Sequence, residues 1–268
     1  MYSDNNSLPN LFIVGAPKCG TTSLVTLLST GDCFVPVTKE PHFLSHDIFQ
    51  NIVKLEDYKK LYKKTKCAVT IDASTHYLYS ESALEYIANS QAKVIILLRS
   101  PNDILHALHW EKLNQGVEDN ENLNEVINEC CREKRTLRFN YVKMAKFSGF
   151  VKKYMSSIHE DRLLILTLDQ LYKDFDQTVK KLEDFLNIQI KASSLQHTNK
   201  ASRNRLRFIK KILNKILEYK RIIGLNHWNT GILNFINKIN TVEKKYTYVK
   251  HDLDFTNEVR LLAKISSS

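Results

Sequence analysis

The sequence lacks several features that would assign it to a special class of protein. No run of about 18 apolar residues occurs, so no transmembrane helix is expected. Residues 1–10 are polar and lack the basic-then-apolar pattern of a signal peptide. The five cysteines form no C-x-x-C pair and have no histidines at zinc-site spacing. Such thiols fit a reducing compartment, so we expect a cytoplasmic protein without a bound metal.

Length and composition are those of a folded enzyme. The 268 residues are 43% hydrophobic and 25% charged, which is typical of a globular chain. No internal repeat or low-complexity linker interrupts them. We therefore expect one domain over residues 1–268, with a polar lead-in at 1–10. The sequence carries no signal of the oligomeric state.

Positive charge is concentrated near the C-terminus. The net charge is +10, and residues 199–250 hold thirteen basic side chains against two acidic ones. We expect residues 199–268 to form a basic, mostly helical segment. Its charge would suit an acidic substrate or peripheral contact with an anionic membrane, although a solvated helix face explains it equally well. No nucleic-acid motif accompanies the charge, which disfavours a specific nucleic-acid partner.

Short apolar runs alternate with helical patterns along the chain. Strands are predicted at residues 11–14, 33–37, 68–71, 94–98 and 163–168. Helices are predicted at residues 21–29, 51–64, 81–88, 102–114, 123–156 and 174–186. This alternation predicts an α/β fold with a mainly parallel central sheet flanked by helices, similar to the P-loop NTPases.

The first predicted strand enters a turn that suits a phosphate. Gly15 and Gly20 have the G-x-x-x-x-G spacing of a Walker A loop, but Lys18 lies inside the turn rather than after Gly20. Three hydroxyl residues then open the next helix: Thr21, Thr22 and Ser23. Free N–H groups and the positive end of the helix dipole favour an anion at this place. A plain structural turn is the alternative.

Two further segments carry groups of chemical interest. Lys39, Glu40 and His42 bring a cation, a potential base and an imidazole into one loop, and Pro41 keeps Glu40 extended. Arg99 follows the strand predicted at 94–98, at the sheet edge where ligands of α/β proteins collect. Its planar guanidinium suits a phosphate, or it forms a structural ion pair.

The segment Pro17-Lys18-x-Gly20-Thr21-Thr22-Ser23 resembles the 5′-phosphosulfate loop of sulfotransferases that use 3′-phosphoadenosine-5′-phosphosulfate (PAPS). The resemblance implies that the loop holds the 5′-phosphate and that Lys18 contacts the bridging oxygen of the leaving group. Arg99-x-Pro101 is similar to the family's 3′-phosphate motif. An Asn-Lys segment at 199–200, followed by Arg203 and Arg205, resembles the part that closes over the nucleotide and implies two further ligands.

Residues 40–43, Glu-Pro-His-Phe, resemble a segment of heparan-type glycan sulfotransferases. There the glutamate is the general base for the acceptor hydroxyl, which implies this role for Glu40, with His42 as its helper. Together these resemblances imply a PAPS-dependent sulfotransferase whose acceptor is a carbohydrate hydroxyl. Residues 72–77, Asp-Ala-Ser-Thr-His-Tyr, are similar to a further family segment that is often Glu-Ala-Ser-x-x-Tyr.

Two positions depart from the family pattern. The serine expected eight residues after Arg99 is Ala107, so His106, His109 or the arginines would have to hold the 3′-phosphate. The aspartate expected after Phe43 is Ser45, and Asp47 is at a shifted spacing. Two other functions remain open: a P-loop kinase with Asp72 on Mg²⁺, and a non-enzymatic basic module that binds an anionic membrane or nucleic acid.

Overall fold

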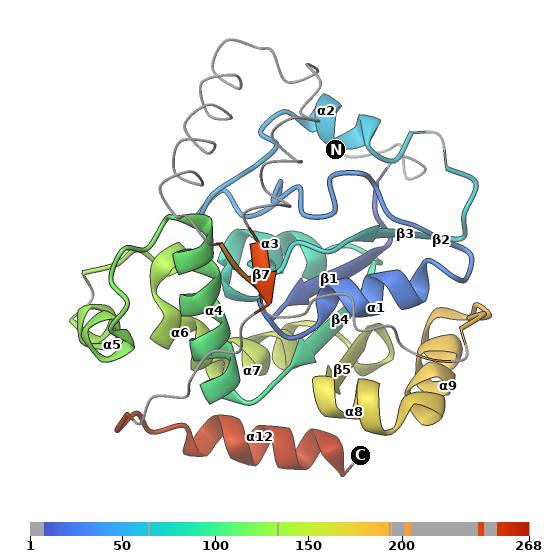
Figure 1. Cartoon of the computed structure of the whole chain (residues 1–268). Helices are drawn as coiled ribbons and strands as arrows, with labels where there is room; N and C mark the ends of the chain where they lie inside the picture. Colours follow the sequence, from blue (N-terminus) through green and yellow to red (C-terminus); the bar gives the residue numbers. More distant parts are fainter. Residues whose placement is uncertain are drawn as a thin grey trace.

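A five-stranded parallel sheet forms the centre of the computed structural model, which describes residues 8–63, 65–132, 134–192, 194, 202–204, 241–243 and 251–267 (Figure 1). Its strands are β1 (Leu11–Gly15), β2 (Cys33–Phe34), β3 (Val69–Asp72), β4 (Lys93–Leu98) and β5 (Leu163–Thr167), in the order β2-β3-β1-β4-β5. β1 and β4 pair in the middle and are almost wholly buried, as their continuous apolar runs predict. The predicted fold class is confirmed.

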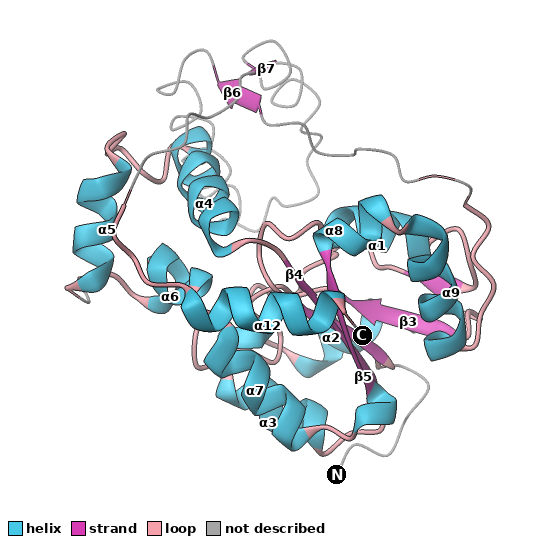
Figure 2. Ribbon diagram, turned by 90° about the horizontal axis from the view of Figure 1, so that it is seen from below, coloured by secondary structure: helices cyan, strands magenta, loops and turns pink. Residues whose placement is uncertain are grey.

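Helices cover both faces of the sheet. They are α1 (Thr21–Leu28), α2 (Leu55–Lys60), α3 (Glu81–Ala88), α4 (Pro101–Gln115), α5 (Leu123–Cys131), α6 (Tyr141–Ala145), α7 (Ser148–Ser157), α8 (Leu168–Lys173), α9 (Phe175–Leu186) and α12 (Thr256–Ser266). In Figure 2, α1, α8 and α9 lie together on one side of the strands, and α3 and α7 lie on the other. Among the described residues, no helix has the length and apolar character needed to cross a bilayer.

The topology collects the predicted site segments at one edge. All strands are parallel, so their carboxyl ends meet there. β1 ends at Gly15, before the glycine turn, and β3 ends at Asp72. β4 ends at Leu98, one residue before Arg99. The pairing of β1 with β4 shifts register between Ile13 and Gly15, where the chain leaves the sheet for the turn.

The helix predicted over residues 123–156 is wrong as a single element. The structure divides it into α5, a short 3₁₀ turn at Leu137–Phe139, α6 and α7. Asn140 causes one of these breaks: its fully buried side chain donates to Cys130 O at 3.0 Å and accepts from Lys143 N at 2.9 Å. It thus ties the end of α5 to the start of α6, in the capping role that asparagine favours.

The strand predicted at residues 33–37 is shorter than expected. β2 lies at the edge of the sheet and pairs only over Cys33–Phe34. Pro36 has no N–H to donate to a ladder, and Val37 is fully exposed.

The C-terminal helix α12 packs beside β5 and α7. Ser148 donates its backbone N–H and its hydroxyl to Glu258 Oε1, at 3.2 Å and 2.6 Å. The amide of Gln170 in α8 donates to Ile265 O at 3.2 Å. Within the basic segment, β6 (Ser202–Asn204) pairs antiparallel with β7 (Thr241–Glu243). Residues 205–240 and 244–250 lie outside the described residues, so the helical character expected for them stays a prediction.

Candidate active site

The turn between β1 and α1 has the backbone of an anion cradle. Lys18 and Gly20 adopt positive φ angles of 62° and 89°. The φ of Gly20 favours glycine, and a Cβ there would also require the end of the Leu168 side chain to move. Within the part of the chain that the structure describes, no side chain caps α1. The N–H groups of its first turn, at Thr21 and Thr22, therefore face the turn with the positive end of the helix dipole.

The hydroxyl of Ser23 contacts a side chain of α8. Its Oγ lies 3.1 Å from the Tyr172 hydroxyl of α8. The Ser23 side chain therefore connects α1 to α8.

Cys19 is fully buried beneath the turn, and this burial raises the pKa of its thiol although the positive charge of Arg99 opposes the rise. The thiol is thus uncharged, and Arg99 lies close to the turn.

Lys18 forms an ion pair that the sequence does not predict. Its Nζ donates to Glu111 Oε1 at 2.8 Å, across 93 positions of sequence. Glu111 lies on α4, which starts directly after Arg99 and passes close to the turn. The Lys18 side chain is therefore next to the cradle but engaged by a carboxylate.

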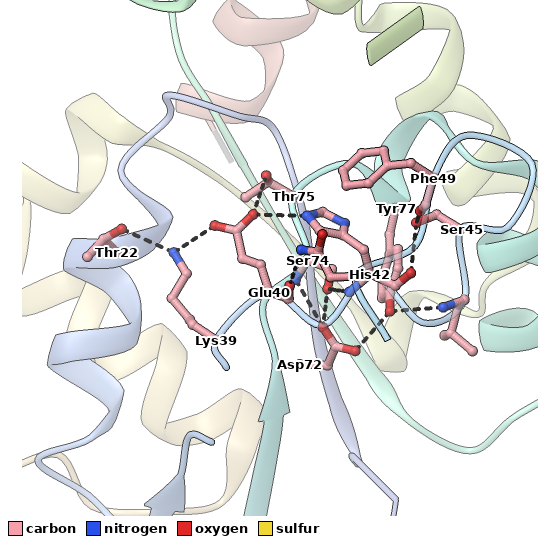
Figure 3. A network of polar contacts seen from close by, with 12 residues as sticks. Thr22, Lys39, Glu40, His42, Ser45, Phe49, Asp72, Ser74, Thr75 and Tyr77 are labelled. Carbon is pink, nitrogen blue, oxygen red and sulfur yellow. Dashed lines mark hydrogen bonds and ion pairs between the residues drawn. The ribbon is translucent and has the colours of Figure 1, made fainter. Parts of the chain in front are cut away.

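Lys39, Glu40 and His42 form a connected polar network (Figure 3). The Lys39 ammonium lies 3.1 Å from Thr22 Oγ1 and 3.1 Å from Glu40 Oε1. The other oxygen, Oε2, accepts from Thr75 Oγ1 at 3.0 Å and lies 3.3 Å from His42 Nε2. Lys39 thus connects the first turn of α1 to the candidate base, Glu40. The sequence placed Lys39 and Glu40 in one loop but did not predict the contact with Thr22.

The network keeps Glu40 ionised. Partial burial alone would raise its pKa, but the hydrogen bond and charge of His42 and the charge of Lys39 lower it to about 2. Nearby, burial lowers the pKa of His76 to about 3, and the adjacent His42 adds to the effect. The two imidazole centroids are 5.2 Å apart, and each ring has a buried Nδ1 without a hydrogen-bond partner among the described residues. His76 is therefore an uncharged neighbour of the Glu40–His42 pair.

The loop that carries Glu40 is anchored to the end of β3. His42 has a positive φ of 48°, and its N–H donates to Ser74 Oγ at 2.9 Å. Ser74 Oγ in turn donates to Asp72 Oδ1 at 2.6 Å. Asp72 Oδ2 accepts from the hydroxyls of Tyr58 and Tyr77 at 2.7 Å and 3.0 Å. Asp72 is fully buried and saturated with donors, so its geometry disfavours the role of magnesium ligand in a kinase.

Asp47 also has a structural role. Its Oδ2 accepts from Glu81 N at 2.9 Å, and its Oδ1 accepts from the hydroxyls of Ser80 and Ser82 at 2.5 Å and 2.7 Å. These contacts cap α3, so Asp47 does not stand in for the aspartate that Ser45 replaces. Ser45 itself is fully buried and donates to Phe49 O at 2.9 Å.

Arg99 lies at the carboxyl edge, as predicted, and is oriented by an ion pair. Its Nε donates to Asp103 Oδ2 at 3.1 Å in the first turn of α4. Ala107 lies about one turn further along the helix. His106 and His109 were the histidines expected to replace the hydroxyl missing at Ala107. His109 is buried, and its Nε2 lies 2.8 Å from Asn120 O. His106 is also buried, and its ring lies 6.4 Å from that of His251.

The structure describes the backbone of Arg203 but not Arg205. Arg203 lies in β6, whose backbone runs beside α4, the helix that follows Arg99. The Arg203 backbone is therefore near α4. Arg205 lies outside the described residues. Their roles as ligands of the 3′-phosphate stay predictions.

Sequence reasoning missed Glu111 and Thr75 as site residues. Glu111 is four positions after Ala107 and hence on the same face of α4, which is the signal that could have found it. Thr75 lies in the recognised segment 72–77, but only the fold shows its contact with Glu40. Among the described residues, no group of three His, Cys, Asp or Glu side chains is placed to hold a metal ion.

The chain matches a family model and individual relatives. The sulfotransferase domain model matches residues 8–229. Heparan sulfate glucosamine 3-O-sulfotransferase 5 of Mus musculus is 28% identical over 191 residues, which are 68% of this chain and 54% of that protein. Sulfotransferase 2A6 of Rattus norvegicus is 24% identical over 192 residues, which are 69% of this chain and 62% of that protein. The chain thus spans about half the length of the heparan relative.

A solved structure shares the fold. The sulfotransferase from Alicyclobacillus acidocaldarius superposes with a TM-score of 0.63, at 22% identity, over 84% of this chain and 98% of that one. Sulfotransferases of this family use PAPS as the sulfuryl donor. The family model covers most of the chain. Among the described residues, the motif-like segments at 15–23, 40–43, 72–77 and 99–101 follow strands at one edge of the sheet. The chain therefore belongs to the sulfotransferase family.

Proposed function

We propose that this protein transfers the sulfuryl group of PAPS to an acceptor hydroxyl, with Glu40 as the general base. The observation that carries the proposal is the chain of contacts from Thr22 through Lys39 to Glu40, each 3.1 Å long. It connects the candidate phosphate cradle to an ionised carboxylate whose side chain is 32% exposed. A donor and a base held so close are what a direct transfer requires.

The residues at the turn fit the donor. The amides of the first turn of α1, with Lys18 and Gly20, would hold the 5′-phosphate end, and Arg99 would bind the 3′-phosphate. PAPS, when bound, supplies an activated sulfuryl group and a phosphate leaving group. We assign a supporting role to Lys39, whose ammonium lies between the cradle and the base. Arg203 and Arg205 remain proposed ligands of the 3′-phosphate.

In the proposed step, the oxygen of the acceptor hydroxyl attacks sulfur while Glu40 takes the proton of that hydroxyl. The bond from sulfur to the 5′-phosphate oxygen, in line with the attack, breaks. Lys18 neutralises the charge that develops on the departing phosphate oxygen. His42 and Thr75 hold Glu40 Oε2, which fixes the direction in which the carboxylate faces. The proposed step requires no metal ion.

We further propose a carbohydrate as the acceptor. Support comes from the Glu-Pro-His-Phe segment at 40–43 and from the likeness to an enzyme named for heparan sulfate glucosamine. A small-molecule hydroxyl is the competing class of acceptor. Transfer of ³⁵S from PAPS to a panel of glucosamine oligosaccharides, phenols and sterols tests the proposal. Label in the oligosaccharides supports it, and label in the phenols or sterols alone contradicts it.

Donor binding is tested separately from the acceptor. The product nucleotide 3′-phosphoadenosine 5′-phosphate (PAP) is expected to raise the melting temperature, because a ligand that binds only the folded state stabilises it. Mg-ATP is the matched control for the kinase alternative. A shift with Mg-ATP and none with PAP would overturn the proposed function.

A further inference from the structure

Among the described residues, the imidazole ring of His42 has one polar contact. Its Nε2 lies 3.3 Å from Glu40 Oε2, whereas its Nδ1 is buried without a hydrogen-bond partner in that part of the chain. In many sites a hydrogen bond at the second ring nitrogen sets the state and direction of a histidine. Here the packing around the ring has to set its direction.

Two aromatic rings pack against the His42 ring and against each other. The centroids of Phe49 and His76 lie 4.5 Å and 5.2 Å from that of His42, and they are 5.0 Å apart. The His76 ring is at 73° to His42 and at 81° to Phe49, the edge-to-face geometry that such rings favour. Figure 3 shows Phe49 beside the His42 ring. In a closely packed interior, the His42 ring cannot turn without displacing one of these neighbours.

Both neighbours of His42 are themselves held in place. The Arg138 guanidinium lies 4.2 Å from the centroid of the Phe49 ring, within the range of a cation–π contact. His76 directly precedes the 3₁₀ turn Tyr77–Tyr79, and its carbonyl accepts from Tyr79 N at 3.1 Å. The two rings therefore form a fixed support for His42.

We propose that His76 is a positioning residue which, together with Phe49, holds the His42 ring with its Nε2 toward Glu40. The role depends on the ring of His76 and its packing, and no proton is exchanged at His76. This inference rests on the proposed function, in which Glu40 is the base.

The uncharged state of His76 suits this role. Burial is the main cause that brings its pKa to about 3; positive charge at His42, Lys112 and Arg138 acts in the same direction, and Glu40 opposes it. An uncharged ring does not repel a proton on His42. The hydrogen bond from His42 to Glu40 is therefore not weakened by its neighbour.

The first test follows the Glu40 carboxylate and needs no transfer reaction. Burial would raise the pKa of Glu40, and the hydrogen bond with His42 is the strongest influence that lowers it. His76→Ala removes the supporting ring, so this pKa should rise from about 2 toward its ordinary value. His76→Phe keeps a ring without nitrogens and should leave the pKa low. Carboxyl ¹³C NMR measures both, with the Glu40 signal assigned by Glu40→Gln.

The other groups that face the carboxylate remain in both variants. Lys39 Nζ and Thr75 Oγ1 contact Glu40 directly, so a change of its pKa reports on His42. Tyr77 also faces the His42 ring, at 6.0 Å and 89°, but its hydroxyl is bound to Asp72. Neither substitution removes these contacts.

The second test measures transfer of ³⁵S to the best acceptor of the panel. His76→Ala should lower the turnover number roughly tenfold, because a misplacement of about 1 Å can cost about 10²-fold. The KM for PAPS and the affinity for PAP should stay within about threefold, since the lost support acts on the base. His76→Phe should restore turnover. Phe150→Ala is the matched control, because it removes an edge-to-face contact with Tyr79, at 5.0 Å and 76°, on α7.

Three results would overturn the inference. Equal losses in His76→Phe and His76→Ala would assign a chemical role to the imidazole nitrogens instead. A wild-type turnover number in His76→Ala would show that the support is not needed, and an unchanged pKa of Glu40 would show that it does not act through His42. If His76→Ala fails to fold, Phe49→Leu, which removes the other ring, must raise the pKa of Glu40 and lower turnover.

Failure of the inference and failure of the proposed function give different results. If the wild-type protein neither binds PAP nor transfers sulfate, the proposed function fails, and the pKa of Glu40 still tests the packing. If it does both and His76→Ala behaves like wild type, only the role of His76 fails.

Discussion

Replacing Glu40 by glutamine tests the proposed chemistry most directly. The carboxylate contacts Lys39, His42 and Thr75, and glutamine retains the size and one acceptor oxygen. It cannot take a proton from a hydroxyl at neutral pH. General bases contribute typically 10²–10⁴-fold, so the turnover number should fall by this factor, or about 3–5 kcal/mol in activation free energy.

The same substitution should leave the fold and the donor site nearly intact. The Lys39–Glu40 pair is partly exposed, and such pairs contribute about 0.2–1 kcal/mol to the free energy of unfolding. In a chain of this size that corresponds to a fall in melting temperature of less than about 4 °C. PAP affinity should stay within about threefold, because Lys39 still contacts Thr22.

The assay measures ³⁵S transfer to the best acceptor of the panel under saturating PAPS, with PAP affinity measured on the same preparation. Glu81→Gln, which removes the same charge from a Lys–Glu pair on α3, is the matched control and should transfer normally. Turnover within tenfold of wild type in Glu40→Gln would refute the role of Glu40 as base. Loss of PAP binding together with turnover would instead show that the network serves donor binding.

Three further changes test the scaffold and its electrostatics. Gly20→Ala should lower the free energy of unfolding in urea by about 1–3 kcal/mol, because the new Cβ contacts Leu168 and the backbone has a φ of 89°. The distorted turn should also lose stabilisation by PAP, and retained PAP stabilisation would contradict this. Asp72→Asn should cost about 3 kcal/mol in the same measurement, since its amide cannot accept from Tyr58, Tyr77 and Ser74 at once. Glu40 has its pKa lowered from 4.5 to about 2, so its stabilisation is present above pH 4.5 and lost as the pH falls to 2. The difference in melting temperature between wild type and Glu40→Gln should therefore vanish by about pH 2, and a constant difference would refute the assignment.

Local sequence patterns predicted the sheet well because its strands are defined by local signals. Each central strand is a short apolar run followed by a turn, and burial on both faces requires such runs. The break at Asn140 was not predictable in the same way. Its helical neighbours continue the amphipathic pattern, and only the tertiary contact with Cys130 shows that the chain reverses. α8 was missed because its six residues directly follow β5 without a separating loop.

The candidate site was predictable where it depends on contiguous motifs. The glycine turn, the Glu40 loop and Arg99 each lie within a few residues of a strand end, so their convergence follows from parallel topology. The residues that form ion pairs and hydrogen bonds with the charged side chains of these motifs were not predictable. Lys18 meets Glu111 across 93 positions, and Glu40 meets Thr75 across 35. Such pairings depend on where side chains point after folding.

The anchoring of the Glu40 loop has a consequence for which parts of this protein can vary independently. Asp72 and Ser74 fasten that loop to β3, which also supports the donor turn through its neighbour β1. The Glu40 loop and the glycine turn are therefore both attached to the same pair of strands, β3 and β1. The segment from α5 to α6 is built on different contacts, through Asn140 and α4. Substitutions on the α5–α6 side can therefore leave the contacts between the Glu40 loop and the sheet unchanged.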